Sequence, residues 1–239
     1  DVKDTTTTTL QVIESVASYE VGDIILTDGT KVSVNDVATY TIDENNKPIG
    51  VAMISDVYGV PTPKVIGLQK SALSWALCKT GYSTKFTNIL CKPIQAGTGA
   101  ALKTTFTGDI DGSDNWEEIC AADPEGTQDP ARYYPAFNFA NTYGTTAGLT
   151  GTVYENGWYV PSIAELCEVY KNKDVIQTSL TIANGFIFDD NHNKYWSSSQ
   201  SPDYNSYVYQ VEFSCGTVYD AGYKSNVDPV FVLHVLNAE

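Results

Sequence analysis

The sequence predicts an α+β protein, with antiparallel strands toward both ends of the chain and helices between them. Asp28-Gly29 lies between two short apolar runs, and such a pair is the strongest local signal for a β-hairpin because both turn residues accept positive φ. Near the other end, residues 207–213 alternate in polarity and residues 230–236 are almost continuously apolar. Between these regions, the Ser-Ile-Ala-Glu segment at 162–165 has the pattern of a helix-capping box.

Composition limits the class of protein. The chain has 239 residues, of which 42% are hydrophobic and 18% charged, so it can bury a sizeable core. Its net charge is −15 and Arg132 is its one arginine, which argues against nucleic acid or an anionic membrane surface as a partner. No apolar run reaches the length of a membrane-spanning helix.

We expect one domain over residues 21–239, because neither a linker nor an internal repeat divides that stretch. Residues 1–20 include a threonine run and predict a flexible leader or tether. The five cysteines are odd in number and lack the paired spacing of a zinc site, so they predict buried thiols rather than a disulfide framework. A bridge between Cys78 and Cys91 stays open.

The first half of the chain reads mainly as strands. Residues 71–78 favour one or two helical turns, with Trp75 on the apolar side, and residues 82–99 show no period and indicate an insertion or an ordered loop. Short apolar runs predict strands at residues 23–26, 31–34, 48–55 and 65–68.

Three aspartates stand close together at Asp109, Asp111 and Asp114, which is the spacing of carboxylates in a calcium loop. An EF-hand needs a bidentate glutamate at its twelfth position, where this chain has Cys120. Asp and Gly are also ordinary turn residues. A turn is therefore the favoured interpretation, and we expect no metal site and no cofactor.

Helices follow in the second half. Asp129-Pro130 supplies an N-cap and a proline for the first helical position of a helix that we expect to stop at Gly144. A shorter helix over 175–183 should end at Asn184-Gly185. The helix after Ser162 has one apolar face, formed by Ile163, Leu166, Cys167 and Tyr170.

Four segments together resemble a known family. They read YYPAFNFANTYG at 133–144, GWYVPSIAELCEVY at 157–170, YWSSSQ at 195–200 and VEFSCG at 211–216. The chain resembles the C-type lectin fold of the formylglycine-generating-enzyme subtype. More narrowly, it resembles surface proteins diversified by diversity-generating retroelements, such as the treponemal variable lipoproteins. The resemblance covers about 23–236 and implies two helices packed on small twisted antiparallel sheets, with Trp158 and Trp196 in the core.

The resemblance also implies a variable region over about 195–236, on a cell-surface protein held by a lipid anchor upstream of this sequence. Retroelement mutagenesis acts on adenines of asparagine-type codons, so residues such as Tyr, Asp, Ser and Asn scatter over fixed positions. The positions implied as ligand-binding are Tyr204, Asn205, Tyr207, Tyr209, Cys215, Thr217, Tyr219, Asp220, Ala221, Tyr223, Ser225, Asn226 and Asp228.

Composition supports a binding surface, because Tyr with Ser, Gly and Asn is also the palette of antibody paratopes. The alternative is a half-solvated sheet, since Tyr has high strand propensity. One conflict is visible: Tyr207 and Tyr209 are in phase with Val211 and Phe213, so only a bulge or twist would bring them to the surface. The residues expected to be buried are Val211, Phe213, Val218, Val230, Val232 and Val235.

We therefore expect a surface-displayed binding protein without catalysis, monomeric, whose ligand is a protein or another macromolecule. Of the two histidines, His192 lies in a polar loop and His234 in an apolar strand, and no motif ties either to a nucleophile. The paired cysteines of formylglycine-generating enzymes are absent, since only Cys215 lies in that region. A carbohydrate-binding lectin-like adhesin, possibly metal dependent, is the alternative, and an enzyme on this scaffold is a third.

Overall fold

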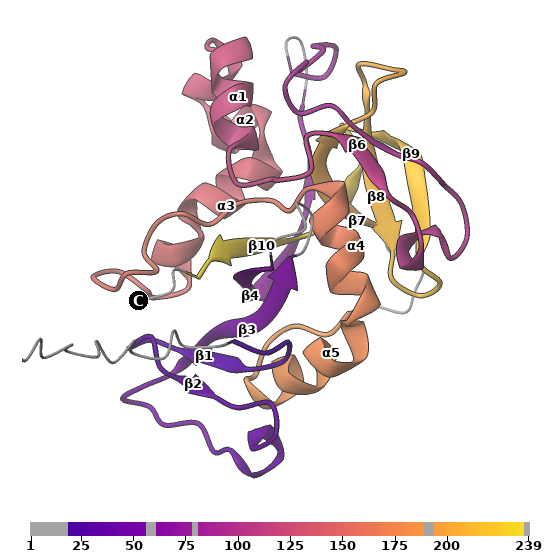
Figure 1. The fold of residues 1–239 in the computed structure, drawn as a ribbon. Helices are drawn as coiled ribbons and strands as arrows, with labels where there is room; N and C mark the ends of the chain where they lie inside the picture. Colours follow the sequence, from indigo (N-terminus) through magenta and orange to yellow (C-terminus); the bar gives the residue numbers. More distant parts are fainter. Residues whose placement is uncertain (1–18, 56–60, 78–80, 189–193, 237–239) are drawn as a thin grey trace, which may run out of the picture.

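The computed structural model describes residues 19–55, 61–77, 81–188 and 194–236. A five-stranded antiparallel sheet has the order β10-β4-β3-β1-β2 (Figure 1). The expected hairpin is confirmed: Gly29 has a φ of +86° and its N–H donates to the Leu26 carbonyl at 3.0 Å. The strands of this sheet are β1 (Ile24–Leu26), β2 (Lys31–Val32), β3 (Pro48–Ser55), β4 (Thr62–Ser74) and β10 (Val227–Val235).

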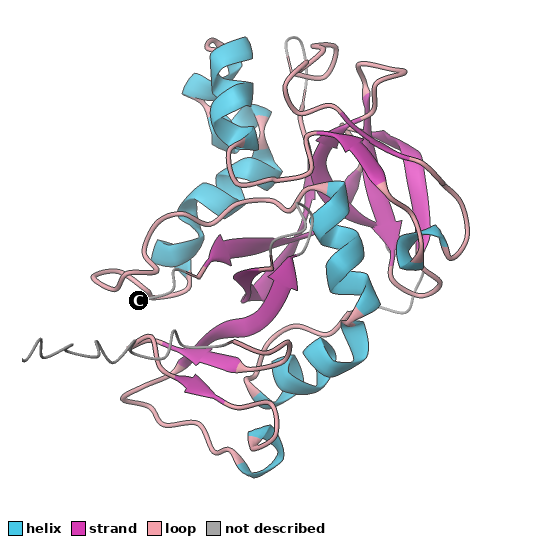
Figure 2. Ribbon diagram, viewed as in Figure 1, coloured by secondary structure: helices cyan, strands magenta, loops and turns pink. Residues whose placement is uncertain are grey.

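A second sheet has three strands in the order β7-β8-β9, and β7 packs against β10 of the first. β5 and β6 form a two-stranded ribbon, and β5 lies within the aperiodic stretch at residues 82–99. Figure 2 shows the helices in cyan lying beside the strands in magenta. The bounds are β5 (Cys91–Pro93), β6 (Phe106–Gly108), β7 (Lys194–Gln200), β8 (Tyr207–Glu212) and β9 (Thr217–Tyr223).

The helix signals are largely confirmed. The Ser162 hydroxyl accepts a hydrogen bond from the Glu165 N–H at 3.2 Å, and the Glu165 carboxylate accepts from the Ser162 N–H at 2.8 Å, which completes the capping box. Asn184 takes a φ of +58° just after the last helix. The α-helices are α1 (Asn115–Ala122), α2 (Pro130–Tyr133), α3 (Pro135–Thr146), α4 (Ile163–Lys171) and α5 (Lys173–Ile182), and 3₁₀ turns lie at Val37–Thr39, Ala100–Leu102 and Gly126–Gln128.

The helix expected from Asp129 to Gly144 is divided into α2 and α3. Tyr134 has φ −134° and ψ 59° because the ring of Pro135 disfavours helical geometry in the residue before it. Gly144 does not stop α3, which continues to Thr146; it lies against the Glu155 carbonyl, where a side chain would collide. The glycine there serves a close approach rather than a helix end.

The segment at 71–78 was expected to be helical, but its first four residues form a strand. Residues 71–74 form the end of β4 and pair with β10, where Ser71 faces Val230 and Ser74 faces Val227. This long-range pairing overrides the local helical pattern. Pro229 lacks an N–H but is tolerated because β10 is an edge strand of its sheet.

The large sheet is buried on both faces. One core cluster joins Ile24, Val51 and Ile66 to α4 and α5, and the other joins Ile25 and Val65 to α3 and an aromatic group. Two-sided burial explains why β3 is almost continuously apolar rather than alternating. These antiparallel sheets with few helices confirm the α+β class.

Most of the expected core positions are buried. Trp158 and Trp196 are buried, as expected. Val235 is the exception, because it is only half-buried at the end of the edge strand. The other expected core residues, all fully buried, are Val211, Phe213, Val218, Val230 and Val232.

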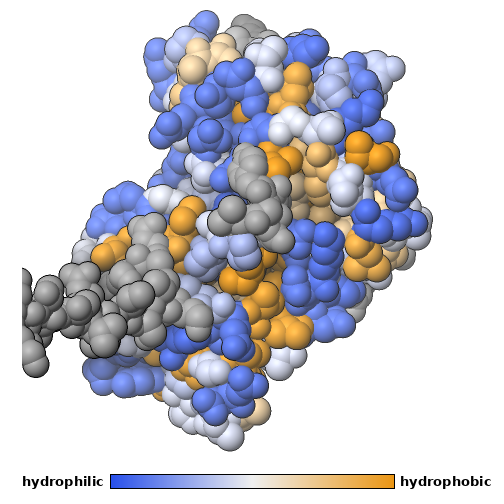
Figure 3. All heavy atoms as spheres, in the orientation of Figure 1, coloured by the Kyte–Doolittle hydropathy of each residue, from blue (hydrophilic) through white to orange (hydrophobic). Residues whose placement is uncertain are grey.

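The surface carries both hydrophilic and hydrophobic residues on the face drawn in Figure 3. Hydrophilic residues cover the part occupied by α1 and α2, and hydrophobic residues gather toward the middle of the face. Among the described residues, no helix has the length and hydropathy needed to span a membrane. Residues 1–18 of the expected leader, and His192, lie outside the described residues.

Candidate ligand-binding surface

A β-bulge organises the tyrosine-rich end of the second sheet. Tyr209 of β8 faces two residues of β9, Asp220 and Ala221, so β9 carries one extra residue at this point. Both residues of the bulge are exposed. Bulges re-aim side chains next to functional sites, and this one turns an acidic side chain outward. The pairs that flank the bulge are Val208 with Gly222 and Gln210 with Tyr219.

Three tyrosines form a contiguous cluster beside the bulge. The Tyr207 ring lies 5.0 Å from the Tyr204 ring and 4.7 Å from the Tyr223 ring, centroid to centroid. The Tyr207 hydroxyl donates to the Tyr223 hydroxyl at 3.0 Å, and this hydrogen bond raises the pKa of Tyr207. Tyr204 is 62% exposed and Tyr223 is 45% exposed, so the cluster offers aromatic faces to solvent.

Two adjoining cavities open beside this cluster. The smaller has a volume of about 70 Å³ and the larger about 350 Å³, and both are lined by Asp203 and Tyr204. We call the combined feature the tyrosine groove. Its lining comprises Tyr82, Ser83, Ser201, Asp203, Tyr204, Asn205, Ser206, Tyr207, Asp220 and Ala221.

Gln200, at the end of β7, ties the two walls of the tyrosine groove together. Its side-chain N–H₂ group donates to the Thr84 carbonyl at 3.0 Å and to the Asn205 carbonyl at 2.5 Å. Its side-chain oxygen accepts from the Phe86 N–H at 2.6 Å. One buried amide therefore fixes the backbone of the 81–86 loop and of the 203–206 loop.

Lys224 is the second buried support. Its ammonium group donates to the carbonyls of Gly81 at 2.9 Å and Thr84 at 3.1 Å. It also lies 4.7 Å from the Trp75 ring and 4.6 Å from the Phe86 ring. The side chain is fully buried, and this burial lowers the pKa of Lys224 to about 7. The 81–84 wall thus depends on a lysine at the end of β9.

The structure brings together only part of the expected site. Ser225 and Asn226 are exposed in the turn that follows β9. The expected residues that line or adjoin the tyrosine groove are Tyr204, Asn205, Tyr207, Asp220, Ala221 and Tyr223.

Two expected residues, Tyr209 and Thr217, are buried rather than exposed. Tyr209 is 2% exposed and Thr217 is 7% exposed, so neither side chain belongs to an open surface. The bulge explains why Tyr209 is buried. Its extra residue is in β9, so the alternation of side chains along β8 is unchanged and the Tyr209 side chain stays in the core. Asp228 is half-buried and its carboxylate accepts a hydrogen bond from the Gln210 side chain at 2.9 Å.

Cys215, Thr217 and Tyr219 lie near the β8–β9 turn, at the opposite end of the hairpin from the tyrosine groove. The Cys215 sulfur lies 2.9 Å from the Thr217 hydroxyl. The Tyr219 hydroxyl donates to the Glu212 carboxylate at 2.7 Å, and the Lys194 ammonium lies 3.8 Å from the Tyr219 ring centroid. These side chains are engaged with their neighbours and form a separate group.

Sequence reasoning missed half of the groove lining. Tyr82 and Ser83 come from the aperiodic stretch, far from the C-terminal region in sequence. Ser201, Asp203 and Ser206 lie within the expected variable region but are not among the positions expected to bind ligand. The one available signal is composition, since Tyr-Ser at 82–83 repeats the palette of the C-terminal loops.

The aspartate cluster keeps its expected turn, in which the Asp111 N–H donates to the Asp109 carboxylate at 3.3 Å, and it adjoins a buried ion pair. Lys64, 2% exposed, contacts Asp111 at 3.2 Å and also pairs with the fully buried Glu165. The Tyr159 hydroxyl donates to Glu165 at 2.8 Å. Burial raises the pKa of the nearby Asp109 to about 7. Within the described ranges, no three His, Cys, Asp or Glu residues are grouped as a metal site.

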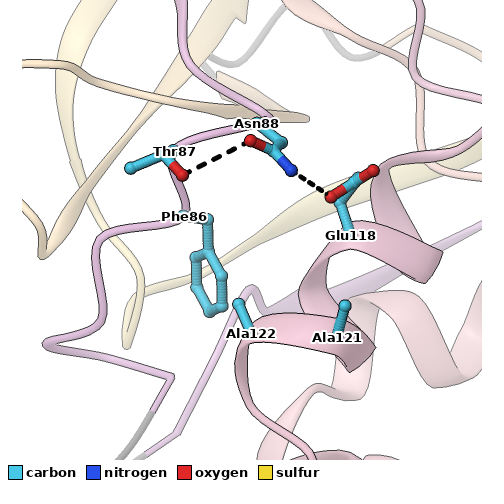
Figure 4. A pocket seen from close by; sticks show the side chains of 6 residues that line it. All are labelled: Phe86, Thr87, Asn88, Glu118, Ala121 and Ala122. Carbon is cyan, nitrogen blue, oxygen red and sulfur yellow. Dashed lines mark hydrogen bonds between the residues drawn. The ribbon is translucent and has the colours of Figure 1, made fainter.

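Another cavity, of about 210 Å³, lies between the 86–88 loop and α1. Figure 4 shows the Phe86 ring and the methyl groups of Ala121 and Ala122 around it. Its polar side chains bond to one another, with Asn88 donating to Glu118 and accepting from Thr87. It presents less unpaired polar chemistry than the tyrosine groove.

The remaining reactive side chains are held in the scaffold. His234 has both ring nitrogens against backbone carbonyls, of Val235 at 2.6 Å and of Asn156 at 2.9 Å. These contacts hold the His234 ring against the backbone of the scaffold. Cys91 and Cys167 are buried free thiols, and burial raises the pKa of the Cys91 thiol to about 12. Cys78, the other half of the Cys78–Cys91 bridge left open by the sequence, lies outside the described residues.

A comparison with solved structures finds a similar fold. The crystal structure of a fimbrial protein from Bacteroides ovatus ATCC 8483 matches with a TM-score of 0.58 and 18% sequence identity. The match covers 90% of this chain and 49% of that protein, so the chain spans about half the length of its structural neighbour. No protein-family model and no curated protein sequence matches the chain.

Proposed function

We propose that this chain is a non-catalytic ligand-binding protein displayed at the cell surface, and that the tyrosine groove is its binding site. The observation that carries the proposal is the exposed cluster of Tyr204, Tyr207 and Tyr223 beside two adjoining cavities. Tyrosine gives a large contact area at low entropic cost, which suits a recognition surface. The fold shared with a fimbrial protein favours surface display.

The proposal extends to the scaffold and to its variation. We regard the chain as a C-type lectin-like protein of the formylglycine-generating-enzyme subtype, diversified by a retroelement in its C-terminal region. Support comes from the segregation of side chains: Gln200 and Lys224 are buried and bind backbone carbonyls, while Tyr204 and Tyr223 are exposed. Substitutions at exposed positions cost little stability, so specificity can change on a constant frame.

Deep sequencing of the gene's 3′ segment in a growing population tests the diversification. We expect substitutions at exposed positions such as 204, 205, 207, 220, 221 and 223, and none at the buried Tyr209 and Thr217. A uniform segment, or variation at Tyr209 as frequent as at Tyr204, would contradict diversification. If the protein binds a ligand but its C-terminal sequence does not vary, the protein is an adhesin with a fixed specificity.

A carbohydrate-binding adhesin is the second candidate. Asp203 lies beside Tyr204 in the groove, and carboxylates accept hydrogen bonds from sugar hydroxyls. Glycan arrays probed with and without calcium separate the two candidates. Calcium-dependent glycan binding that is lost in Tyr204→Ala, with no peptide ligand, would favour the adhesin.

A further inference from the structure

We infer that the tyrosine groove binds a basic segment of a protein partner, with one Arg or Lys side chain seated in the smaller cavity between aromatic rings and carboxylates. This inference rests on the proposed function and adds the chemical class of the ligand. The first observation is charge: the lining includes Asp203 and Asp220 and no basic residue. Neither carboxylate is in a salt bridge with a described basic residue.

The two carboxylates line the same cavity, together with Ser201. Burial raises the pKa of the Tyr209 hydroxyl, which bonds to Ser201, and the charges of Asp220 and Asp203 act in the same direction. Two negative charges at one cavity create a local potential that attracts a cation and repels an anion.

The aromatic side chains supply the second contribution. Tyr204 and Tyr207 line the same cavity, and Tyr204 is largely exposed. A cation over the face of a tyrosine ring is attracted by the ring quadrupole, most often when the cation is a guanidinium group. Neighbouring carboxylates complete the planar, multidentate environment that suits arginine.

Size and shape favour a side chain of a polypeptide over a free ion. One water molecule needs about 10–15 Å³ of cavity volume. The smaller cavity has about 70 Å³ and therefore has room for about five groups of the size of a water molecule. A guanidinium has four heavy atoms and fits this space. The adjoining cavity of about 350 Å³ shares Asp203 and Tyr204 with it and reaches Tyr82 and Ser83, so it can hold the flanking chain.

The cations near the groove do not neutralise it. Lys224 is fully buried, lines neither cavity and donates to the Gly81 and Thr84 carbonyls, and its pKa of about 7 leaves it only partly charged at neutral pH. Lys85 is exposed in the same loop but does not line either cavity. The chain as a whole carries −15, which accelerates encounter with a basic partner.

A random dodecamer peptide library displayed on phage tests the inference on the full chain. Selection runs in parallel on the native protein and on Tyr204→Ala, and Tyr219→Ala at the other end of the sheet is the matched tyrosine control. We expect Arg and Lys to be enriched about threefold or more among peptides that need Tyr204. We expect Asp203→Asn and Asp220→Asn each to lower the affinity for the best such peptide about threefold. The loss of affinity should be larger at low salt, where charges are screened less.

The outcomes separate the two levels of the proposal. Peptides that depend on Tyr204 but show no enrichment in Arg or Lys would overturn the basic partner and leave the groove as a binding site. Peptides enriched in Arg whose affinity ignores both aspartate substitutions would also overturn it. If no peptide depends on Tyr204 although Tyr204→Ala keeps the native melting temperature, the basic-partner inference fails and the groove loses its support as a peptide-binding site.

Discussion

Replacing Lys224 with methionine should change how the stability of the protein depends on pH. Lys224 is fully buried, and burial lowers its pKa to about 7 from an ordinary value of 10.5. Between these pH values the unfolded chain binds a proton that the folded chain has released. The free energy of unfolding therefore rises with pH across that range, and Lys224 destabilises the protein most below pH 7.

The magnitude follows from the two pKa values. Each pH unit contributes at most about 1.4 kcal/mol per proton, and the slope is smaller close to pH 7, where the folded lysine is still partly charged. From pH 6 to pH 8.5, Lys224 should add about 2 kcal/mol to the free energy of unfolding. Lys224→Met removes this contribution but leaves the Gly81 carbonyl without its donor, which costs about 1–3 kcal/mol at every pH.

The assay is chemical denaturation of the native protein and Lys224→Met at pH 6, 7, 8 and 8.5. Other titrating groups are common to both proteins and cancel in the difference between them. Lys103→Met, at an exposed lysine, is the matched control and should keep the native pH dependence. Parallel pH profiles for the native protein and Lys224→Met would refute the reasoning, because they would show that Lys224 keeps the same protonation in both states.

Three further substitutions test the scaffold by chemical denaturation. Glu165→Gln removes the buried one of the two charge partners of Lys64 and should cost about 3–5 kcal/mol, whereas Glu168→Gln in a partly exposed pair should cost under about 1 kcal/mol; equal losses would contradict the buried pair. Gly222→Ala would place a methyl group 2.8 Å from the Trp196 ring and should cost about 1–3 kcal/mol, so an unchanged midpoint would count against that packing. Tyr209→Ala should cost about 3–5 kcal/mol and Tyr204→Ala under about 0.5 kcal/mol, and the reverse order would reject the division between core and groove tyrosines.

Local signals in the sequence were enough for much of the fold. The Asp28-Gly29 turn and the capping box of α4 form as expected, because each depends on backbone geometry and hydrogen bonds within a few residues. The apolar run at 48–55 became β3 with the same bounds. The acidity and the tyrosine-rich C-terminal composition were likewise readable without a structure.

Tertiary structure decided the features that depend on long-range pairing. Residues 71–74 became strand because β10 lies beside them, and the β9 bulge left Tyr209 buried while Asp220 turned outward. The groove needs Tyr82 and Asp203, which are far apart in sequence and meet only because Gln200 binds both loops. The sequence alone therefore determined the elements and the chemistry of their side chains, and packing determined which side chains share a surface, because register and burial are set by contacts distant along the chain.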